Sequence, residues 1–70
     1  MPMRNKVGEF LDSQGISVYR MIRDAQISDT TGYKLAADAA YLPSGKVLEA
    51  ICKAYNVQPG ELLEWIPEET

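Results

Sequence analysis

Serine stands directly before three segments of this chain whose apolar residues recur with the 3.6-residue period of a helix: Ser17, Ser28 and Ser44. Serine is a favoured N-cap, because its hydroxyl accepts a hydrogen bond from an otherwise unpaired N–H group in the first helical turn. After Ser17, apolar residues recur at i, i+3, i+4 and i+7, at Val18, Met21, Ile22 and Ala25. Only Gln26 and Ile27 separate this segment from Ser28. The sequence therefore predicts two helices joined by a sharp turn.

The helix predicted after Ser28 begins more clearly than it ends. Asp29 lies in its first turn, where the positive end of the helix dipole favours an anion. Leu35 and the alanines after it recur at helical spacing, but Gly32 costs roughly 1 kcal/mol relative to alanine. The pattern predicts the start of this helix and leaves its last residue open.

A first helix is predicted ahead of this pair, over about residues 4–14. Val7, Phe10 and Leu11 fall at i, i+3 and i+4 and form its apolar face. Gly15 follows directly and suits the left-handed conformation of a helix C-terminus.

Two further helices are predicted in the second half of the chain. The segment after Ser44 ends at Asn56, which also tolerates the left-handed conformation of a helix end. Its apolar residues are Val47, Leu48, Ile51, Cys52 and Tyr55. A short last helix opens at Pro59, has Glu61 in its first turn and stops before Pro67. Its apolar residues are Leu62, Leu63, Trp65 and Ile66.

The predicted fold is all-α, a compact five-helix domain. No segment alternates Val or Ile with polar residues over four or more positions, so no strand is expected. A chain of 70 residues leaves room for one small domain only, and 46% apolar against 24% charged residues is typical of a globular protein. We expect a single domain over residues 1–70, with the helix pair at about 17–37 and an acidic C-terminal end at 61–70.

The net charge of −3 is unevenly distributed. Residues 1–23 carry four basic and two acidic residues, 4 − 2 = +2, whereas residues 59–70 carry four glutamates and no basic residue, −4. Residues 1–58 alone therefore have a charge of 7 − 6 = +1. The part of the domain formed by residues 1–58 could therefore bind phosphate groups with one face.

The composition argues against an enzyme. There is no histidine, which excludes a Ser-His-Asp triad, a Cys-His pair and a histidine metal site. The ten carboxylates stand at ordinary helical spacings and offer neither a defined acid–base pair nor a metal cluster. We expect no catalytic residue, no metal, no cofactor and no small-molecule ligand.

A single cysteine and the absence of long apolar runs indicate a cytoplasmic protein. Cys52 cannot form an intrachain disulfide, and its place beside Leu48 and Ile51 predicts a buried core thiol. No apolar run approaches the roughly 18 to 20 residues that span a bilayer, and the first residues lack a secretory pattern. We expect no membrane partner.

Polar side chains cluster at the start of the helix predicted after Ser28, as they do in helices that recognise DNA sequence. The cluster comprises Ser28, Asp29, Thr30, Thr31, Tyr33 and Lys34. A helix presented by its amino end brings N–H groups and a positive dipole toward phosphate, and small polar side chains there reach base edges in the major groove. Arg20 and Arg23 could add phosphate contacts. The same cluster is also a good N-cap for any helix, and isolated basic residues are typical of a solvated face.

Several stretches resemble the Cro and phage-repressor type of helix-turn-helix domain, often called the XRE family: residues 15–21, 27–28, 35, 41–44 and 47–63. Residues 47–63 are the most specific part, since they are similar to the family's fourth and fifth helices almost residue for residue. The resemblance implies a five-helix repressor-like domain, usually a homodimer on a two-fold DNA operator, that acts as a cytoplasmic transcriptional regulator.

The resemblance also implies which residues contact DNA. In the helix after the turn they are Ser28, Asp29, Thr30, Thr31, Tyr33 and Lys34, and in the helix before it Ser17 and Arg20, which would touch backbone phosphates. Asp29 has two possible roles, accepting a hydrogen bond from cytosine N4 or only favouring the helix dipole.

Three residues inside the motif depart from the family pattern. Ile22 stands where the family usually has alanine, Gln26 where it has glycine, and Gly32 where it has a large aliphatic residue. In this fold the first and third of these sites face each other, so the exchange roughly conserves core volume. We predict that Ile22 packs onto the backbone at Gly32. Gln26 should cost about 1 kcal/mol if it adopts the left-handed conformation.

Apolar residues near the C-terminus could contact a second subunit: Leu62, Trp65 and Ile66. They could equally close the core of the same chain. A second interpretation of the whole sequence also remains open, in which the helix-turn-helix fold binds a protein, as an antitoxin or regulator partner would, with weak or no DNA binding. A positive and open surface around residues 28–34 would favour the DNA reader.

Overall fold

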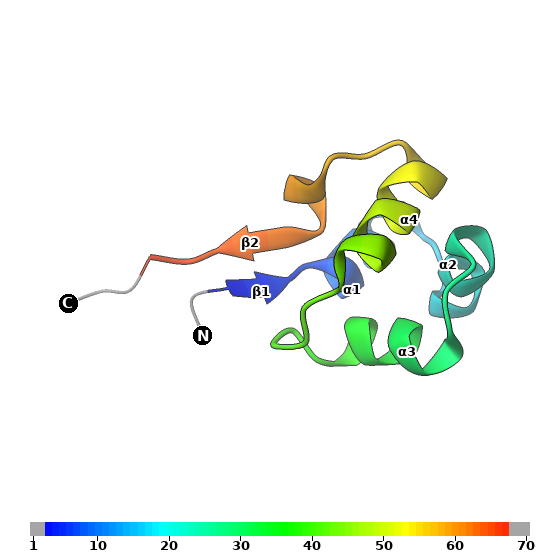
Figure 1. Ribbon diagram of the computed structural model, residues 1–70, viewed down its shortest axis with the longest axis horizontal. Helices are drawn as coiled ribbons and strands as arrows, with labels where there is room; N and C mark the ends of the chain where they lie inside the picture. The colour runs from blue at the N-terminus through cyan, green and yellow to red at the C-terminus, as the bar shows by residue number, and fades with distance from the viewer. Residues whose placement is uncertain (1–2, 68–70) are drawn as a thin grey trace.

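Four α-helices form the body of the protein, and a short two-stranded ribbon projects from one end of it (Figure 1). The computed structural model describes residues 3–67. The helices are α1 (Val7–Gln14), α2 (Val18–Ala25), α3 (Asp29–Ala37) and α4 (Gly45–Tyr55). The other elements are a 3-10 helix, η1 (Pro59–Glu61), and two strands, β1 (Met3–Asn5) and β2 (Leu63–Trp65).

All three predicted serine caps are confirmed. The hydroxyl of Ser17 accepts a hydrogen bond from the backbone N–H of Arg20 at 3.0 Å. Ser28 and Ser44 cap α3 and α4 in the same way, at 3.2 Å and 3.3 Å. The chain therefore enters each of these helices where the sequence predicts it.

The predicted ends of α1 and α4 are also confirmed. Gly15 and Asn56 have left-handed backbone conformations, with φ of 67° and 54°. Each lets the following N–H group turn back to the last helical turn, from Ile16 to the carbonyl of Leu11 and from Val57 to that of Cys52. Both bonds measure 3.0 Å and pair carbonyls that the helix itself leaves free.

The core lies where α1, α2, α3, α4 and the residue after η1 meet. Its buried side chains are Val7, Phe10, Leu11, Met21, Ile22, Ala25, Leu35, Ile51 and Leu62. Each fully buried large apolar side chain stabilises the fold by roughly 1.5–3 kcal/mol relative to an exposed one. α4 contributes only Ile51 in fully buried form, and its larger apolar residues Val47, Leu48, Cys52 and Tyr55 are half-buried.

The predicted fifth helix is wrong beyond its first turn, and so is the prediction that the chain has no strand. η1 ends at Glu61, and Leu63–Trp65 continue as β2, antiparallel to β1. The pairs are Met3 with Trp65, Arg4 with Glu64, and Asn5 with Leu63. The first helix correspondingly begins at Val7 instead of near residue 4.

Long-range pairing explains this difference. An apolar run of a few residues fits a strand or a buried helix equally well, and its partner decides between them. The backbone N–H of Lys6 donates to the carbonyl of Leu62 at 2.7 Å, which brings residues 3–5 beside 63–65. That partner lies 60 positions away in the sequence, so no local pattern reveals it.

Asn5 links β1 to the connection between α3 and α4. Its side chain is 4% exposed, and it is the one buried polar residue among those that the structure describes. Its side-chain amide donates to the carbonyls of Asp38 and Tyr41. Its side-chain oxygen accepts from the backbone N–H of Val7 at 3.0 Å, at the start of α1. Its own backbone N–H donates to the carbonyl of Ala39 at 2.8 Å. One side chain thus holds three segments together.

Within residues 3–67, no helix is both long and apolar enough to cross a membrane. The same residues form no group of three or more histidine, cysteine, aspartate or glutamate side chains that could hold a metal ion.

Candidate nucleic-acid interface

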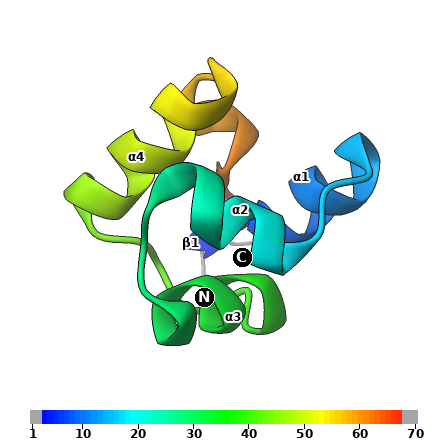
Figure 2. The same cartoon turned by 90° about the vertical axis from the view of Figure 1, so that its right-hand side faces the viewer.

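α2 and α3 pack against each other (Figure 2). At their contact, one residue fills the space that the other leaves. Ile22 is buried and its side chain lies against the backbone of Gly32. A Cβ atom at residue 32 would lie 2.6 Å from Cδ1 of Ile22 and closer still to its Cγ1. The prediction that Ile22 packs onto the backbone at Gly32 is therefore confirmed.

Gln26 forms the turn between the two helices in a left-handed conformation, with φ 58° and ψ 45°. Its backbone N–H and that of Ile27 both turn back to the carbonyl of Ile22. The turn thus keeps the left-handed geometry in which glycine is favoured, although glutamine occupies it.

Gln26→Gly should stabilise the protein by about 1 kcal/mol, because glycine has no Cβ to clash in the left-handed region. Urea unfolding followed by circular dichroism measures the change. Glu49→Gly, at an exposed position inside α4, is the matched control and should destabilise by about 1 kcal/mol. Equal destabilisation by both glycines would contradict the strain assigned to Gln26.

One stripe of α3 faces away from the core. Gly32 and Leu35 are buried, so the opposite side of the helix carries residues spaced i, i+3, i+4 and i+7. These residues are Thr30, Tyr33, Lys34 and Ala37, and all four are exposed. We call them the outward stripe. Ala37 is absent from the predicted contact residues, although continuing the helical period of Thr30, Tyr33 and Lys34 would have found it.

Three hydroxyls near the helix starts, those of Ser17, Ser28 and Thr31, already have hydrogen-bond partners. Ser28 accepts from the backbone N–H of Thr31 and donates to the hydroxyl of Thr31 at 2.8 Å. Thr31 is also half-buried. Ser17 caps α2 with its hydroxyl. These predicted contact residues therefore fall into two sets. The side chains of Ser17, Ser28 and Thr31 shape the helix starts, whereas those of Asp29, Thr30, Tyr33 and Lys34 face solvent.

Arg20 belongs to a small polar network on α2. Its Nε lies 3.6 Å from Oδ2 of Asp24, and the same carboxylate oxygen accepts a hydrogen bond from the hydroxyl of Tyr55 at 2.8 Å. The side chain of Arg20 is nonetheless 70% exposed. An exposed pair of this kind stabilises by less than about 1 kcal/mol, so Arg20 can leave it for a phosphate at little cost.

Two other basic side chains on this surface lie over aromatic rings. The guanidinium carbon of Arg23 is 5.7 Å from the ring centre of Tyr19, and Nζ of Lys34 is 4.7 Å from that of Tyr41. These contacts hold the cations near the surface while leaving them exposed.

Burial, followed by the hydrogen bond to Asp24, raises the pKa of Tyr55 to about 12. Because the ordinary value is 10.0, the folded protein holds this proton more tightly than the unfolded chain. The resulting stability is complete below pH 10 and is lost as the pH rises through 12. Urea unfolding of wild type and Tyr55→Phe across this interval measures it. We expect a smaller fall for the variant, and identical falls would contradict the assignment.

Residues 17–37 carry Arg20, Arg23 and Lys34 against Asp24 and Asp29, a charge of 3 − 2 = +1. The glutamates of the acidic end that the structure describes lie elsewhere. Glu61 lies in η1, and Glu64 pairs with Arg4 at 2.6 Å on the ribbon. Glu68 and Glu69 lie outside the described residues. Among the described carboxylates, those of the C-terminal end thus leave α3 uncovered.

The three candidate subunit contacts separate in the structure. Leu62 has no exposed surface and belongs to the core, so its assignment as a subunit contact is wrong. Trp65 and Ile66 are 63% and 43% exposed. Only these two remain available to another molecule.

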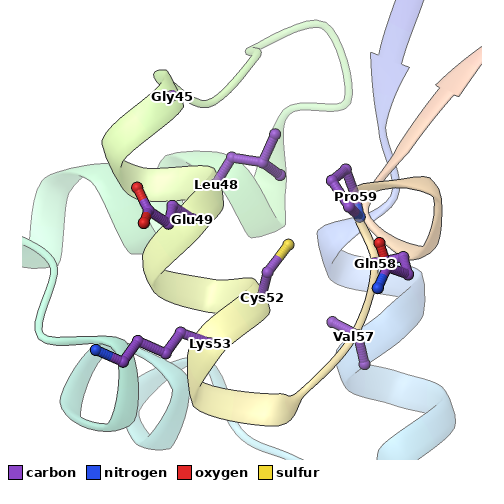
Figure 3. A pocket seen from close by; sticks show the side chains of 8 residues that line it. All are labelled: Gly45, Leu48, Glu49, Cys52, Lys53, Val57, Gln58 and Pro59. Atoms are coloured by element: carbon purple, nitrogen blue, oxygen red, sulfur yellow. The ribbon is translucent and has the colours of Figure 1, made fainter.

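A shallow groove of about 460 Å³ runs between α4 and the segment before η1 (Figure 3). Leu48, Cys52, Val57 and Pro59 supply its apolar lining. Cys52 is half-buried, so the expected core thiol reaches the edge of the core and borders this groove. None of the residues of α2 or α3 lines it, and it is therefore separate from the outward stripe.

Comparisons with known proteins agree with this geometry. The family model described as Cro/C1-type HTH DNA-binding domain matches residues 6–68. A solved structure described as the transcriptional regulator VanUg superimposes with a TM-score of 0.74 at 27% sequence identity, over 97% of this chain and 92% of that one. No curated protein sequence matches the chain.

Proposed function

Because the chain belongs to the family of Cro/C1-type helix-turn-helix DNA-binding domains, we propose that it is a sequence-specific transcriptional regulator that places α3 in the major groove of double-stranded DNA. The family match and the regulator neighbour support a non-enzymatic DNA-binding role. The observation that carries the proposal for this chain is the outward stripe, an exposed face of α3 that the described glutamates of the C-terminal end leave open.

The geometry suggests a division of roles among the predicted contact residues. Thr30 and Tyr33 of the outward stripe read base edges, Lys34 meets a phosphate, and the Ala37 methyl group suits apolar contact with thymine. Asp29, exposed in the first turn, accepts from cytosine N4 or favours the helix dipole. Ser28 and Thr31 shape the first turn of α3, and the backbone N–H groups of that turn bind a DNA phosphate.

Phosphate contacts complete the arrangement. Ser17 and Arg20 lie at the start of α2, and we place them against the DNA backbone, where they set the register of α3 without reading sequence. Few cations are available, since residues 17–37 carry only three. One copy would therefore bind weakly, and we propose that a homodimer binds a two-fold operator with two copies of α3.

A salt titration of binding to a random duplex and to selected sites tests this function. Lys34→Ala should weaken binding to every sequence and lower the log–log salt slope by about 0.9 if Lys34 neutralises one phosphate. Thr30→Ala should instead reduce discrimination between sites by about 1–3 kcal/mol. Lys53→Ala, at the far end of α4, is the charge-matched control and should change neither.

The alternative is a protein-binding module of the same fold. Absence of DNA binding even at low salt would overturn the proposal in its favour. Equal effects of Lys34→Ala and Lys53→Ala would show that binding depends on general charge and not on α3.

A further inference from the structure

Lys34 is the cation of the outward stripe, and its ammonium group lies over an aromatic ring that does not belong to α3. Its Nζ is 4.7 Å from the ring centre of Tyr41, within the roughly 6 Å over which the face of an aromatic ring attracts a cation. Tyr41 belongs to the connection between α3 and α4, which forms a turn directly after α3 (Figure 1). The contact therefore joins the outward stripe to the next segment of the chain.

The folded core fixes the position of Tyr41. Its backbone N–H donates to the carbonyl of Asp38 at 3.1 Å, and its own carbonyl accepts from the side-chain amide of Asn5. Asn5 is only 4% exposed. The side chain of Tyr41 is half-buried and packs against the core. The ring is thus a fixed support for the flexible side chain of Lys34.

The ring holds the ammonium group of Lys34 without neutralising it. Asp38 lies four residues further on, a spacing at which opposite charges pair on a helix. Its Oδ1 instead accepts from the backbone N–H of Ala40 at 3.0 Å. Among the described residues no carboxylate pairs with Lys34, whereas Arg4 and Arg20 both lie beside one. The full positive charge of Lys34 is therefore available to a phosphate.

The second contact between a cation and a ring on this surface lacks such a support. Arg23 lies 5.7 Å from the ring centre of Tyr19, which is one turn away on the same helix. The side chain of Tyr19 is 59% exposed. Both members of that pair can therefore move together, whereas Tyr41 cannot follow Lys34.

A lysine that is already held in place binds a phosphate at a lower entropic cost. Its four-carbon stem is flexible, and fixing it against DNA costs rotamer freedom. Part of that freedom is already lost when the ammonium group rests on a ring, so less remains to be lost on binding. The ammonium group has three N–H donors, and the ring covers only one side of it.

We propose that Tyr41 is a positioning residue for DNA binding, because its ring holds Lys34 where that side chain meets a phosphate. The inference rests on the proposed function and deepens it by naming the residue on which this phosphate contact depends. Tyr41 acts through Lys34 and not by touching DNA itself. Its role is large for this chain because residues 17–37 carry only three cations.

Nuclear magnetic resonance of the protein without DNA tests the contact itself. Protons above the face of an aromatic ring resonate at higher field, so the ε-methylene protons of Lys34 should lie upfield of those of the exposed Lys53. Tyr41→Leu should abolish this shift and Tyr41→Phe should keep it. Leu42→Ala is the control in the same connection, since it removes exposed apolar surface but no ring, and it should keep the shift as well.

Binding to a random duplex tests the consequence. Tyr41→Leu should weaken binding by about two- to fivefold for each copy bound, the value of one exposed contact of this kind. The log–log salt slope should not change, because Lys34 keeps its charge. Tyr41→Phe and Leu42→Ala should bind like wild type. In a Lys34→Ala background Tyr41→Leu should have no further effect, whereas a merely structural role of Tyr41 would weaken binding there too.

The two measurements separate the inference from the function on which it rests. Equal losses from Tyr41→Leu with and without Lys34, or tighter binding of Tyr41→Leu, would overturn the positioning role. An unshifted Lys34 in wild-type protein that binds DNA would overturn it as well, and this measurement does not depend on how any variant folds. A shifted Lys34 in a protein that binds no DNA would overturn the proposed function, and the positioning role with it.

Discussion

Replacing Ile22 with alanine and Gly32 with isoleucine in the same chain should give a more stable protein than either replacement alone. Ile22→Ala removes a buried side chain and leaves a cavity beside a glycine that cannot fill it, at a cost of about 2–5 kcal/mol. Gly32→Ile forces a branched side chain into space that Ile22 occupies, and overpacking costs about 1–3 kcal/mol or more. In the double variant the new isoleucine occupies the space that the old one leaves.

Urea unfolding measures the coupling between the two sites. The free energy of unfolding of the double variant should exceed, by at least about 2 kcal/mol, the value expected if the two single substitutions were additive. Because a small domain has little stability to lose, a single severe change can unfold it, and the milder cycle of Ile22→Val and Gly32→Ala provides a second measurement. Additive costs in both cycles would show that the two residues do not share one volume.

Asn5→Ala should destabilise the protein by about 2–4 kcal/mol, an effect far larger than that of a surface substitution. The variant leaves the carbonyls of Asp38 and Tyr41 and the N–H of Val7 without their side-chain partner. A buried polar group that loses its partner costs about 1–3 kcal/mol.

Asn5→Asp separates the hydrogen bonds from the size of the side chain. At neutral pH the carboxylate keeps the acceptor for Val7 but faces two carbonyls without a donor. The variant should regain stability as the pH falls, because a protonated carboxyl donates to one of them. Urea unfolding of both variants between neutral and acidic pH measures this. The exposed Gln14→Ala serves as control for the loss of a side-chain amide, and an Asn5→Asp variant whose stability does not rise on acidification would contradict the role of the amide.

Features that depend on neighbouring residues were predictable from the sequence. The serine caps, Gly15 and Asn56 are of this kind, because a cap involves residues within one helical turn. The contact of Ile22 with Gly32 was also predictable, since two departures at facing sites compensate each other in volume. The start of α3 at the end of a sharp turn belongs to the same group.

Features that depend on distant residues were not predictable. Leu62 and Trp65 differ by three positions and by little in polarity, yet one is buried and the other exposed. What separates them is the pairing with residues 3–5, which the local pattern does not contain. The sequence did not indicate the role of Asn5 either. Its side-chain amide donates to backbone carbonyls, and every residue has a carbonyl whatever its side chain.

In the candidate site, too, some features were predictable from the sequence and others only from the structure. The sequence indicates which helix presents its amino end, but Ser28 and Thr31 look as suitable for base contact as Thr30 does. Only the hydrogen bonds between the first two, and the half-buried position of Thr31, distinguish them from the outward stripe.

The pairing of the chain's two ends has a consequence for how the protein moves. Arg4 and Glu64 are 60 positions apart, so pairing their strands closes a long loop, and the bond between Lys6 and Leu62 already brings the ends of that loop together. Beyond that anchor the outer pairs can open and close while the four helices remain folded. The protein can therefore lose or regain a surface for other molecules on a timescale set by local fraying, without exposing its interior.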